Sequence, residues 1–132
     1  MIIYIIHLET DLTDEKSILA SISLIKQKYQ TFDALINCAG IMSIQEANAI
    51  SYDELETLMK INTLAPIFLT SQLFDLIKTN KADILNVGST VGTKAYPSQE
   101  AYGASKRALR GISQNLQLEL AETKCRVIQF NP

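Results

Sequence analysis

Tyr102 and Lys106 stand four residues apart in the segment "YGASK" (102–106), which has the pattern of a helix. At this spacing both side chains project from one helical face. A free tyrosine has a pKa of about 10, and an ammonium within about 4–6 Å favours the phenolate. The pair could therefore act as a general acid/base and its tuner at neutral pH. The spacing alone is more often that of two surface neighbours.

Ser89 precedes Tyr102 by 13 residues and ends the apolar segment "DILNVGS" (83–89). Its hydroxyl would either bond the backbone of its own turn or stabilise charge on a substrate oxygen. Two further polar segments, "NCAG" (37–40) and "NP" (131–132), also follow expected strands. Ligands of open α/β sheets bind beyond the carboxyl ends of the strands, where we expect these three segments to converge.

The elements that must position these residues alternate along the chain. We expect strands at 2–8, 33–40, 83–89 and 126–132, and helices at 14–29, 51–78 and 101–122. Thr13 is the expected N-cap of the first helix, "SYDE" (51–54) has the form of a capping box, and Pro66 should bend the second helix. This order predicts an α/β fold with a parallel β-sheet, helices on both faces and one domain over 1–132.

Composition excludes several classes of partner. The chain has 47% apolar residues, a net charge of -2 and a pI near 5.3, which leaves no basic stripe for nucleic acid. No apolar run approaches the ~20 residues of a membrane span. Cys38 and Cys125 lack metal-ligand spacing, so we expect no metal site and reduced thiols in a cytoplasmic protein, with a disulfide left open.

Five motifs in order resemble the short-chain dehydrogenase/reductase family of NAD(P)-binding Rossmann-fold oxidoreductases. "NVGSTVG" (86–92) followed by "YGASK" resembles its active-site block, and "NCAG" resembles its "NNAG" turn. "DLT" (11–13) matches the end of its third strand, "KINTLAP" (60–66) its helical asparagine, and Pro132 the proline of a Pro-Gly turn. Together these matches identify the chain as a member of that family.

The resemblance implies a set of catalytic residues: Asn62, Ser89, Tyr102 and Lys106. Tyr102 would exchange a proton with the substrate oxygen, Ser89 would bond that oxygen, and Lys106 would tune Tyr102 and hold the nicotinamide ribose. The family uses the main-chain carbonyl of the residue matching Asn62 to hold a water in a proton relay. Pro66 lies four residues further on and has no N–H to give that carbonyl. From the residues alone, Asn62 is instead a satisfied core asparagine.

The resemblance also implies binding of NAD or NADP, without distinguishing them, and a small carbonyl or alcohol substrate. The matched cofactor-binding positions are Asp11, Leu12, Asn37, Ala39, Gly40, Tyr102, Lys106 and Pro132. Helices 51–78 and 101–122 resemble the pair through which family members dimerise, so a homo-oligomer is expected.

The glycine loop TGxxxGxG, which holds the pyrophosphate in this family, is absent from this sequence. The chain matches about strands 3 to 6 of a doubly wound sheet, a single partial domain. In the order 3-2-1-4-5-6, segment 2–8 would lie roughly 14 Å from strand 33–37, at about 4.8 Å per strand. We expect segment 2–8 to move beside 33–37, to pair with another chain, or to be completed by further sequence.

Three functions fit these motifs. The first is NAD(P)-dependent interconversion of a carbonyl and an alcohol, with Tyr102 as general acid/base. The alternative is a truncated, non-catalytic fragment that cannot bind cofactor normally and at most associates through its helices. A sugar-nucleotide epimerase or dehydratase of the extended branch also carries YxxxK, but "NCAG" and the spacing favour the shorter branch.

Overall fold

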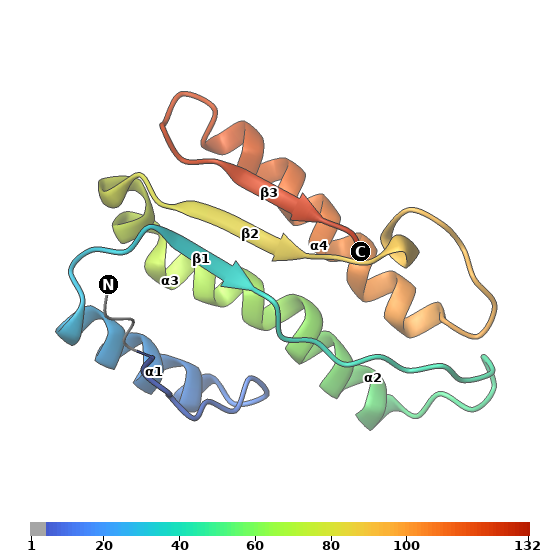
Figure 1. The fold of residues 1–132 in the computed structure, drawn as a ribbon. Coiled ribbons are helices and arrows are strands. Elements are labelled where there is room, and N and C mark those ends of the chain that lie inside the picture. The colour runs from blue at the N-terminus through green and yellow to red at the C-terminus, as the bar shows by residue number, and fades with distance from the viewer. Residues whose placement is uncertain (1–4) are drawn as a thin grey trace.

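The computed structural model describes residues 5–132, which form a parallel three-stranded sheet. Its strands lie in the order β1 (Ala34–Asn37), β2 (Asp83–Val87) and β3 (Val127–Phe130). Asn37 pairs with Asn86, and Asn86 pairs with Gln129, so the three strands end together (Figure 1). The expected parallel α/β fold of Rossmann type, incomplete relative to a full doubly wound sheet, is confirmed.

The helices occur in the predicted order, with one before β1 and the others between strands. They are α1 (Glu15–Lys28), α2 (Tyr52–Met59), the π-helical turn η1 (Lys60–Leu64), α3 (Ala65–Asn80), the 3-10 turn η2 (Thr90–Gly92) and α4 (Glu100–Glu119). Within residues 5–132, none of the helices combines the length and apolar character needed to cross a bilayer.

The first helix begins one residue later than expected. Asp14 is its N-cap, and its carboxylate accepts hydrogen bonds from the amides of Lys16 and Ser17. The prediction of Thr13 as N-cap was wrong, because the Thr13 hydroxyl and amide both donate to the Asp11 carboxylate, at 2.7 and 2.8 Å. Asp11 thus closes a local turn just before the helix.

The expected single helix 51–78 is divided by a π-helical turn. Ser51 and Glu54 form the predicted capping box at its start. At η1 the Ala65 amide donates to the Lys60 carbonyl, five residues earlier, and Pro66 follows in the first turn of α3. The bend predicted from Pro66 therefore takes the form of an inserted residue, a common consequence of a lost i to i-4 bond.

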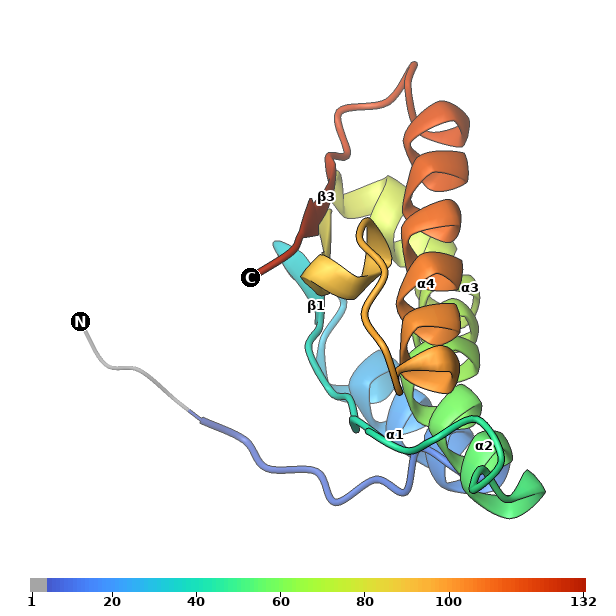
Figure 2. The ribbon, with the colours of Figure 1, turned by 90° about the vertical axis from the view of Figure 1, so that its right-hand side faces the viewer.

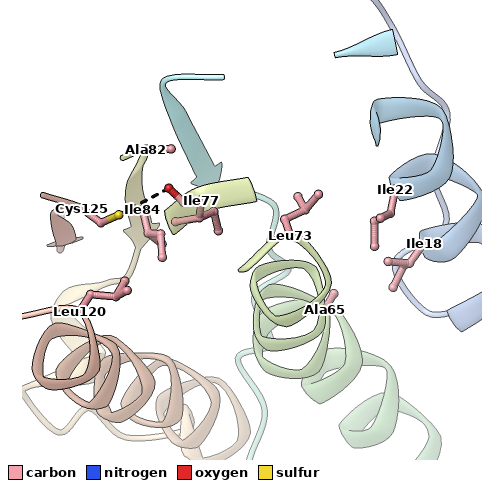
Figure 3. Packing of buried hydrophobic residues seen from close by; sticks show 9 residues of the cluster. All are labelled: Ile18, Ile22, Ala65, Leu73, Ile77, Ala82, Ile84, Leu120 and Cys125. Carbon is pink, nitrogen blue, oxygen red and sulfur yellow. Dashed lines mark hydrogen bonds between the residues drawn. The ribbon is translucent and has the colours of Figure 1, made fainter. Parts of the chain in front are cut away.

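The core lies between the helices and one face of the sheet. Ile18 and Ile22 of α1 point toward α3, and Ile77 and Ile84 pack near Leu120 (Figure 3). α3 and α4 lie together along one side of the sheet (Figure 2). Residues that point to the other face are exposed, namely Ile36 (59%), Ile128 (41%) and Phe130 (55%). The second helical layer expected on that face is not formed by the described residues.

The expected strand 2–8 is not formed where it can be assessed. Residues 5–8 belong to no strand, and Ile5 is 90% exposed, so the prediction was wrong for them. Residues 2–4 lie outside the described part of the chain. Among residues 5–132 the outer edge of β1 has no strand partner, so pairing of this segment beside β1 is not observed. A strand needs a neighbouring ladder to satisfy its backbone, and these residues run away from the sheet (Figure 2).

Candidate active site

Tyr102 and Lys106 lie on one face of α4, directed at the carboxyl end of β2. The Lys106 Nζ atom is 5.9 Å from the centroid of the Tyr102 ring and donates a 2.9 Å hydrogen bond to the Val87 carbonyl. The Lys106 side chain is 95% buried, being only 5% exposed, whereas Tyr102 is half-buried. The helical spacing thus delivers an aromatic hydroxyl and an ammonium to the same end of the sheet.

Burial lowers the pKa of the Lys106 ammonium, because the charged form loses solvation. The neighbouring Cys38 thiol acts in the opposite direction and raises this pKa by less. Within residues 5–132, Val87 is the single hydrogen-bond acceptor of the Lys106 ammonium, which has three N–H groups. Two donors are therefore left for a ligand at this point.

Ser89 lies at the start of η2, directly after β2. Its Oγ accepts a 3.4 Å hydrogen bond from the Val91 amide, so in this structure the hydroxyl serves its own turn. The turn η2 packs against α4, where a Cβ added to Gly92 would lie 3.2 Å from the Lys106 carbonyl oxygen. In the described chain the Tyr102 hydroxyl makes no hydrogen bond, with Ser89 or any other residue. The turn that follows Ser89 therefore packs against α4, and no hydrogen bond joins Ser89 to Tyr102.

The Asn62 side chain is 1% exposed and fully hydrogen-bonded. Its Oδ1 accepts from the Ile41 amide at 2.8 Å, and its Nδ2 donates to the Ile41 carbonyl at 2.8 Å and to Ser105 Oγ at 3.1 Å. The side chain thus clamps the segment after "NCAG" against the bent helix. This geometry agrees with the satisfied core asparagine inferred from the residues, and leaves the main-chain carbonyl as the group for any relay.

Gly40, the last residue of the "NCAG" turn, lies close to two other candidate site residues. A Cβ there would lie 3.2 Å from Asn62 Oδ1 and 3.4 Å from Lys106 Nζ. Ala39 is exposed beside it, and together with Leu12 and Asn37 it lines a small hollow of about 70 Å³. A side chain at position 40 would press on the Asn62 amide oxygen and touch the end of the Lys106 side chain, which favours glycine there.

The remaining predicted cofactor positions are more scattered. The Asn37 amide is turned into the sheet, where it donates to Asn86 Oδ1 at 2.8 Å. Asp11 lies on the exposed turn before α1, and hydrogen bonds from the Thr13 hydroxyl and amide hold the pKa of the Asp11 carboxyl below its ordinary value. Pro132 is exposed at the end of β3. Asp11 and Pro132 thus make no contact with Lys106 that this structure records.

The three strand ends meet as predicted. A Cβ on Gly88 would overlap the side chains of Gln129 and Asn131, so the chain after β2 touches the chain after β3. A row of buried polar side chains supports this edge: Asn86 donates to Ser113 Oγ at 2.8 Å, and Ser113 Oγ bonds Gln129. The segments after 37, 87 and 130 therefore form one rim, above which Tyr102 and Lys106 stand.

Sequence reasoning did not single out Ser105, Gly92 or Gln129. Ser105 lies inside "YGASK", and its position next to Lys106 is the signal that could have found it.

A larger hollow of about 520 Å³ lies between α1 and α3, lined by Leu12, Ile18, Leu64 and Phe68 among others. Its lining also includes Glu15, Lys60 and Ser71 but none of Ser89, Tyr102 and Lys106, so we place the chemistry at the rim. No group of three or more His, Cys, Asp or Glu side chains placed to bind a metal occurs in residues 5–132.

Comparisons with known proteins bear directly on this rim. The family model described as "short chain dehydrogenase" matches residues 3–132. The NADP-dependent 3-hydroxy acid dehydrogenase of Schizosaccharomyces pombe is 29% identical over 130 residues, which is 97% of this chain and 50% of that protein. The NADP-dependent 3-hydroxy acid dehydrogenase YdfG of Escherichia coli (strain K12) is 28% identical over 126 residues, 94% of this chain and 51% of that protein. The chain spans about half the length of these curated relatives.

Solved structures share the fold. A 4-hydroxyisoleucine dehydrogenase complexed with NADH and succinate superposes with a TM-score of 0.85 at 29% identity, covering 92% of this chain and 58% of that one. The closed form of serine dehydrogenase complexed with NADP+ has a TM-score of 0.85 at 26% identity, covering 93% and 50%.

Proposed function

The chain belongs to the short chain dehydrogenase family, and from this premise we propose that it carries the catalytic rim of an NAD(P)-dependent oxidoreductase interconverting a carbonyl and an alcohol. The observation that carries the proposal is the buried Lys106 ammonium beside the Tyr102 ring at the carboxyl end of β2. Burying an ammonium that has a single hydrogen-bond acceptor costs free energy, so its presence here favours a functional role. Two of its three N–H groups remain available for a ligand.

Each residue of the rim has a defined task in this proposal. Tyr102 donates its phenolic proton to a carbonyl oxygen during reduction and takes it back during oxidation. Lys106 stabilises the phenolate through its charge. Ser89 rotates its hydroxyl from the Val91 amide toward the substrate oxygen and stabilises charge on it. Asn62 holds the loop through its side chain and offers its main-chain carbonyl to a water.

The residues at the rim fit the nicotinamide-ribose end of NAD(P). Lys106 would bond the ribose hydroxyls, and the exposed backbone at Ala39 and Gly40 would lie against the sugar without a side chain to block it. Leu12 and Asp11 would lie at the adenine end. When bound, the nicotinamide supplies or accepts the hydride. Among the residues of this sequence none forms the TGxxxGxG loop, so the pyrophosphate has no matched site here.

We take small hydroxy acids as the first substrate class and NADP as the first cofactor to test. Two curated relatives, from Schizosaccharomyces pombe and Escherichia coli, bear the name NADP-dependent 3-hydroxy acid dehydrogenase. At 28–29% identity these names support a choice of assay rather than an assignment of substrate.

The test is a fluorescence titration of the chain with NADPH and NADH, followed by turnover of 3-hydroxy acids. We expect saturable binding and a turnover that is lost in Tyr102→Phe. Tyr96→Phe is the matched control, because Tyr96 is 43% exposed in the loop before α4 and its residue four positions on is Glu100 instead of a lysine. Equal activity of the two variants, or no binding of either cofactor at millimolar concentration, would overturn the proposal.

A second candidate is a non-catalytic chain that keeps the fold and associates through its helices. The lack of a TGxxxGxG loop among these 132 residues favours it. For association we propose the outer surface of α3 and α4, where a groove of about 350 Å³ is lined by Ile67, Phe74, Ile112 and Leu116. Sedimentation of the chain tests this surface: we expect a dimer that Ile112→Glu dissociates, and a monomeric unmodified chain would refute it.

A further inference from the structure

Ser105 is the most completely buried polar residue of the catalytic helix, with 0% exposure. It lies between Tyr102 and Lys106 in the sequence, on the side of α4 that faces η1. Its hydroxyl makes two hydrogen bonds: Oγ donates to the Tyr102 carbonyl at 2.8 Å and accepts from Asn62 Nδ2 at 3.1 Å. The Ser105 carbonyl in turn accepts from the Thr63 hydroxyl at 3.3 Å. Both the side chain and the backbone of Ser105 thus join α4 to η1.

The directions of these bonds are fixed by chemistry. A backbone carbonyl can only accept, so the single proton of the Ser105 hydroxyl belongs to the bond with the Tyr102 carbonyl. Toward Asn62 the hydroxyl can then only accept, and Asn62 must present its NH2 group to α4. Its Oδ1 is consequently the atom that faces the Ile41 amide. The hydroxyl therefore requires the same one of the two possible Asn62 amide orientations that the Ile41 amide and carbonyl require.

The required orientation bears on the turn that faces Lys106. Only with Oδ1 toward the Ile41 amide and Nδ2 toward the Ile41 carbonyl are both backbone groups of Ile41 satisfied, each at 2.8 Å. Gly40, directly before Ile41, lies against both Asn62 and Lys106. With the Asn62 amide reversed, its NH2 group would face the Ile41 N–H and its oxygen would face the Ile41 carbonyl. Both hydrogen bonds would be lost and the turn would be released.

We propose that Ser105 is a positioning residue: its hydroxyl orients the Asn62 amide and so holds the 39–41 turn against Lys106. The inference rests on the proposed function for its consequence in catalysis, but its structural claim concerns the cofactor-free chain. Ser105 touches neither the reacting atoms nor the cofactor position, and acts through Asn62.

The test compares Ser105→Ala with Ser113→Ala. Ser113 lies on the same helix, is 1% exposed and accepts from the Asn86 amide at 2.8 Å, and its one proton has two acceptors within reach, the Leu109 carbonyl at 2.9 Å and Gln129 Oε1 at 2.6 Å. Substitution by alanine removes one buried hydroxyl in both variants, but Ser113 faces the strands whereas Ser105 faces η1. The readouts are amide hydrogen exchange of Ile41 and the NMR titration of the Lys106 side chain, both without cofactor.

In Ser105→Ala we expect Ile41 exchange to accelerate about tenfold, the fold-change that corresponds to the loss of about one net hydrogen bond. The ammonium-to-amine ratio of Lys106 at a fixed alkaline pH should rise about threefold as the freed turn admits water. Besides Tyr102 on its own helix, the titratable group that faces this ammonium is Cys38, so the titration is repeated in Cys38→Ser. Ser113→Ala should move neither readout, although it lowers the melting temperature.

Ile41 exchange within twofold of the unmodified chain in folded Ser105→Ala would overturn the proposal, as would an equal acceleration in Ser113→Ala. Ser105→Cys keeps the size of the side chain and serves as the second variant. If neither Ser105 variant folds, the hydroxyl is a requirement for folding and the positioning role is rejected. Failure of the proposed oxidoreductase would appear separately, as absent NADPH binding by the unmodified chain.

Discussion

The Lys106 ammonium donates to the Val87 carbonyl at 2.9 Å and so ties α4 to the last residue of the central strand, β2. Lys106 directly follows Ser105, and Val87 directly precedes Gly88 and Ser89, so this bond joins the two halves of the candidate site. The lysine is therefore part of the framework of the rim as well as a candidate partner of Tyr102. Because the ammonium is buried, its protonation state changes the free energy of unfolding.

The first prediction concerns pH. Burial lowers the pKa of Lys106 below 10.5, so in the alkaline range the unfolded chain binds the proton more tightly than the folded chain. Stability from this group therefore rises with pH between the folded pKa and about 10.5, and the penalty is fully present below the folded pKa. In urea unfolding, the difference in unfolding free energy between the unmodified chain and Lys106→Met should increase in favour of the unmodified chain across that range. A flat difference would contradict the desolvation argument.

A second prediction uses two glycines of the chain as a matched pair. Gly92→Ala would place a methyl group 3.2 Å from the Lys106 carbonyl oxygen, and both nearby atoms belong to the backbone and cannot turn aside. We expect a loss of about 1–3 kcal/mol, the usual cost of overpacking. Gly111→Ala meets no atom within 4 Å and lies inside α4, so it should gain roughly 0.5–1 kcal/mol. Urea midpoints that move in the same direction for both variants would refute this account.

Asp83 and Arg126 supply a third prediction at the far end of the sheet. The Arg126 guanidinium bonds both oxygens of the Asp83 carboxylate and lowers the pKa of Asp83 below 3.8. A carboxyl with a depressed folded pKa contributes stability above its unfolded pKa, and this contribution is lost as pH falls through the folded pKa. Arg126 is largely exposed, so the effect should be small and weakened by salt. The difference in melting temperature between Arg126→Met and the unmodified chain should be largest at pH 7 and shrink as the pH is lowered toward 2.

The strands and helices that touch the rim could be predicted because their signals are local. The apolar runs before "NCAG" and "VGS" end where β1 and β2 end, and the Ser51–Glu54 capping box starts its helix as expected. The same-face arrangement of Tyr102 and Lys106 follows directly from the helical repeat. Such features depend on residues a few positions apart, which a single sequence displays.

Other features depend on partners distant in the chain. Segment 2–8 has the pattern of a buried strand, but a strand forms only beside another, and residues 5–8 have none in the described chain. The π turn at η1 follows the local signal of Pro66, but the bonds of its Asn62 to the Ile41 loop and to Ser105 of α4 join residues distant in the chain. The role of Ser105 follows from a hydroxyl direction that no spacing reveals. The Ser89 hydroxyl accepts from the Val91 amide of its own turn, whereas its proposed partner in catalysis is an oxygen of the substrate and lies outside the chain.

The last prediction concerns Pro66 and the shape of the bent helix. Pro66 cannot donate to the Asn62 carbonyl four residues earlier, whereas an alanine would supply that N–H and favour regular α geometry over the π turn. We expect Pro66→Ala to straighten the helix, to engage the Asn62 carbonyl in a regular helical bond, and to reduce turnover on the order of 10- to 100-fold, as a small misplacement of catalytic groups does. Pro97→Ala, in the exposed loop before α4, is the control that should leave turnover unchanged. No catalytic side chain is removed in this variant. A lowered kcat with unchanged NADPH affinity would therefore locate the effect in the Asn62 carbonyl and its relay. Unchanged turnover in a straightened helix would exclude that carbonyl from the mechanism.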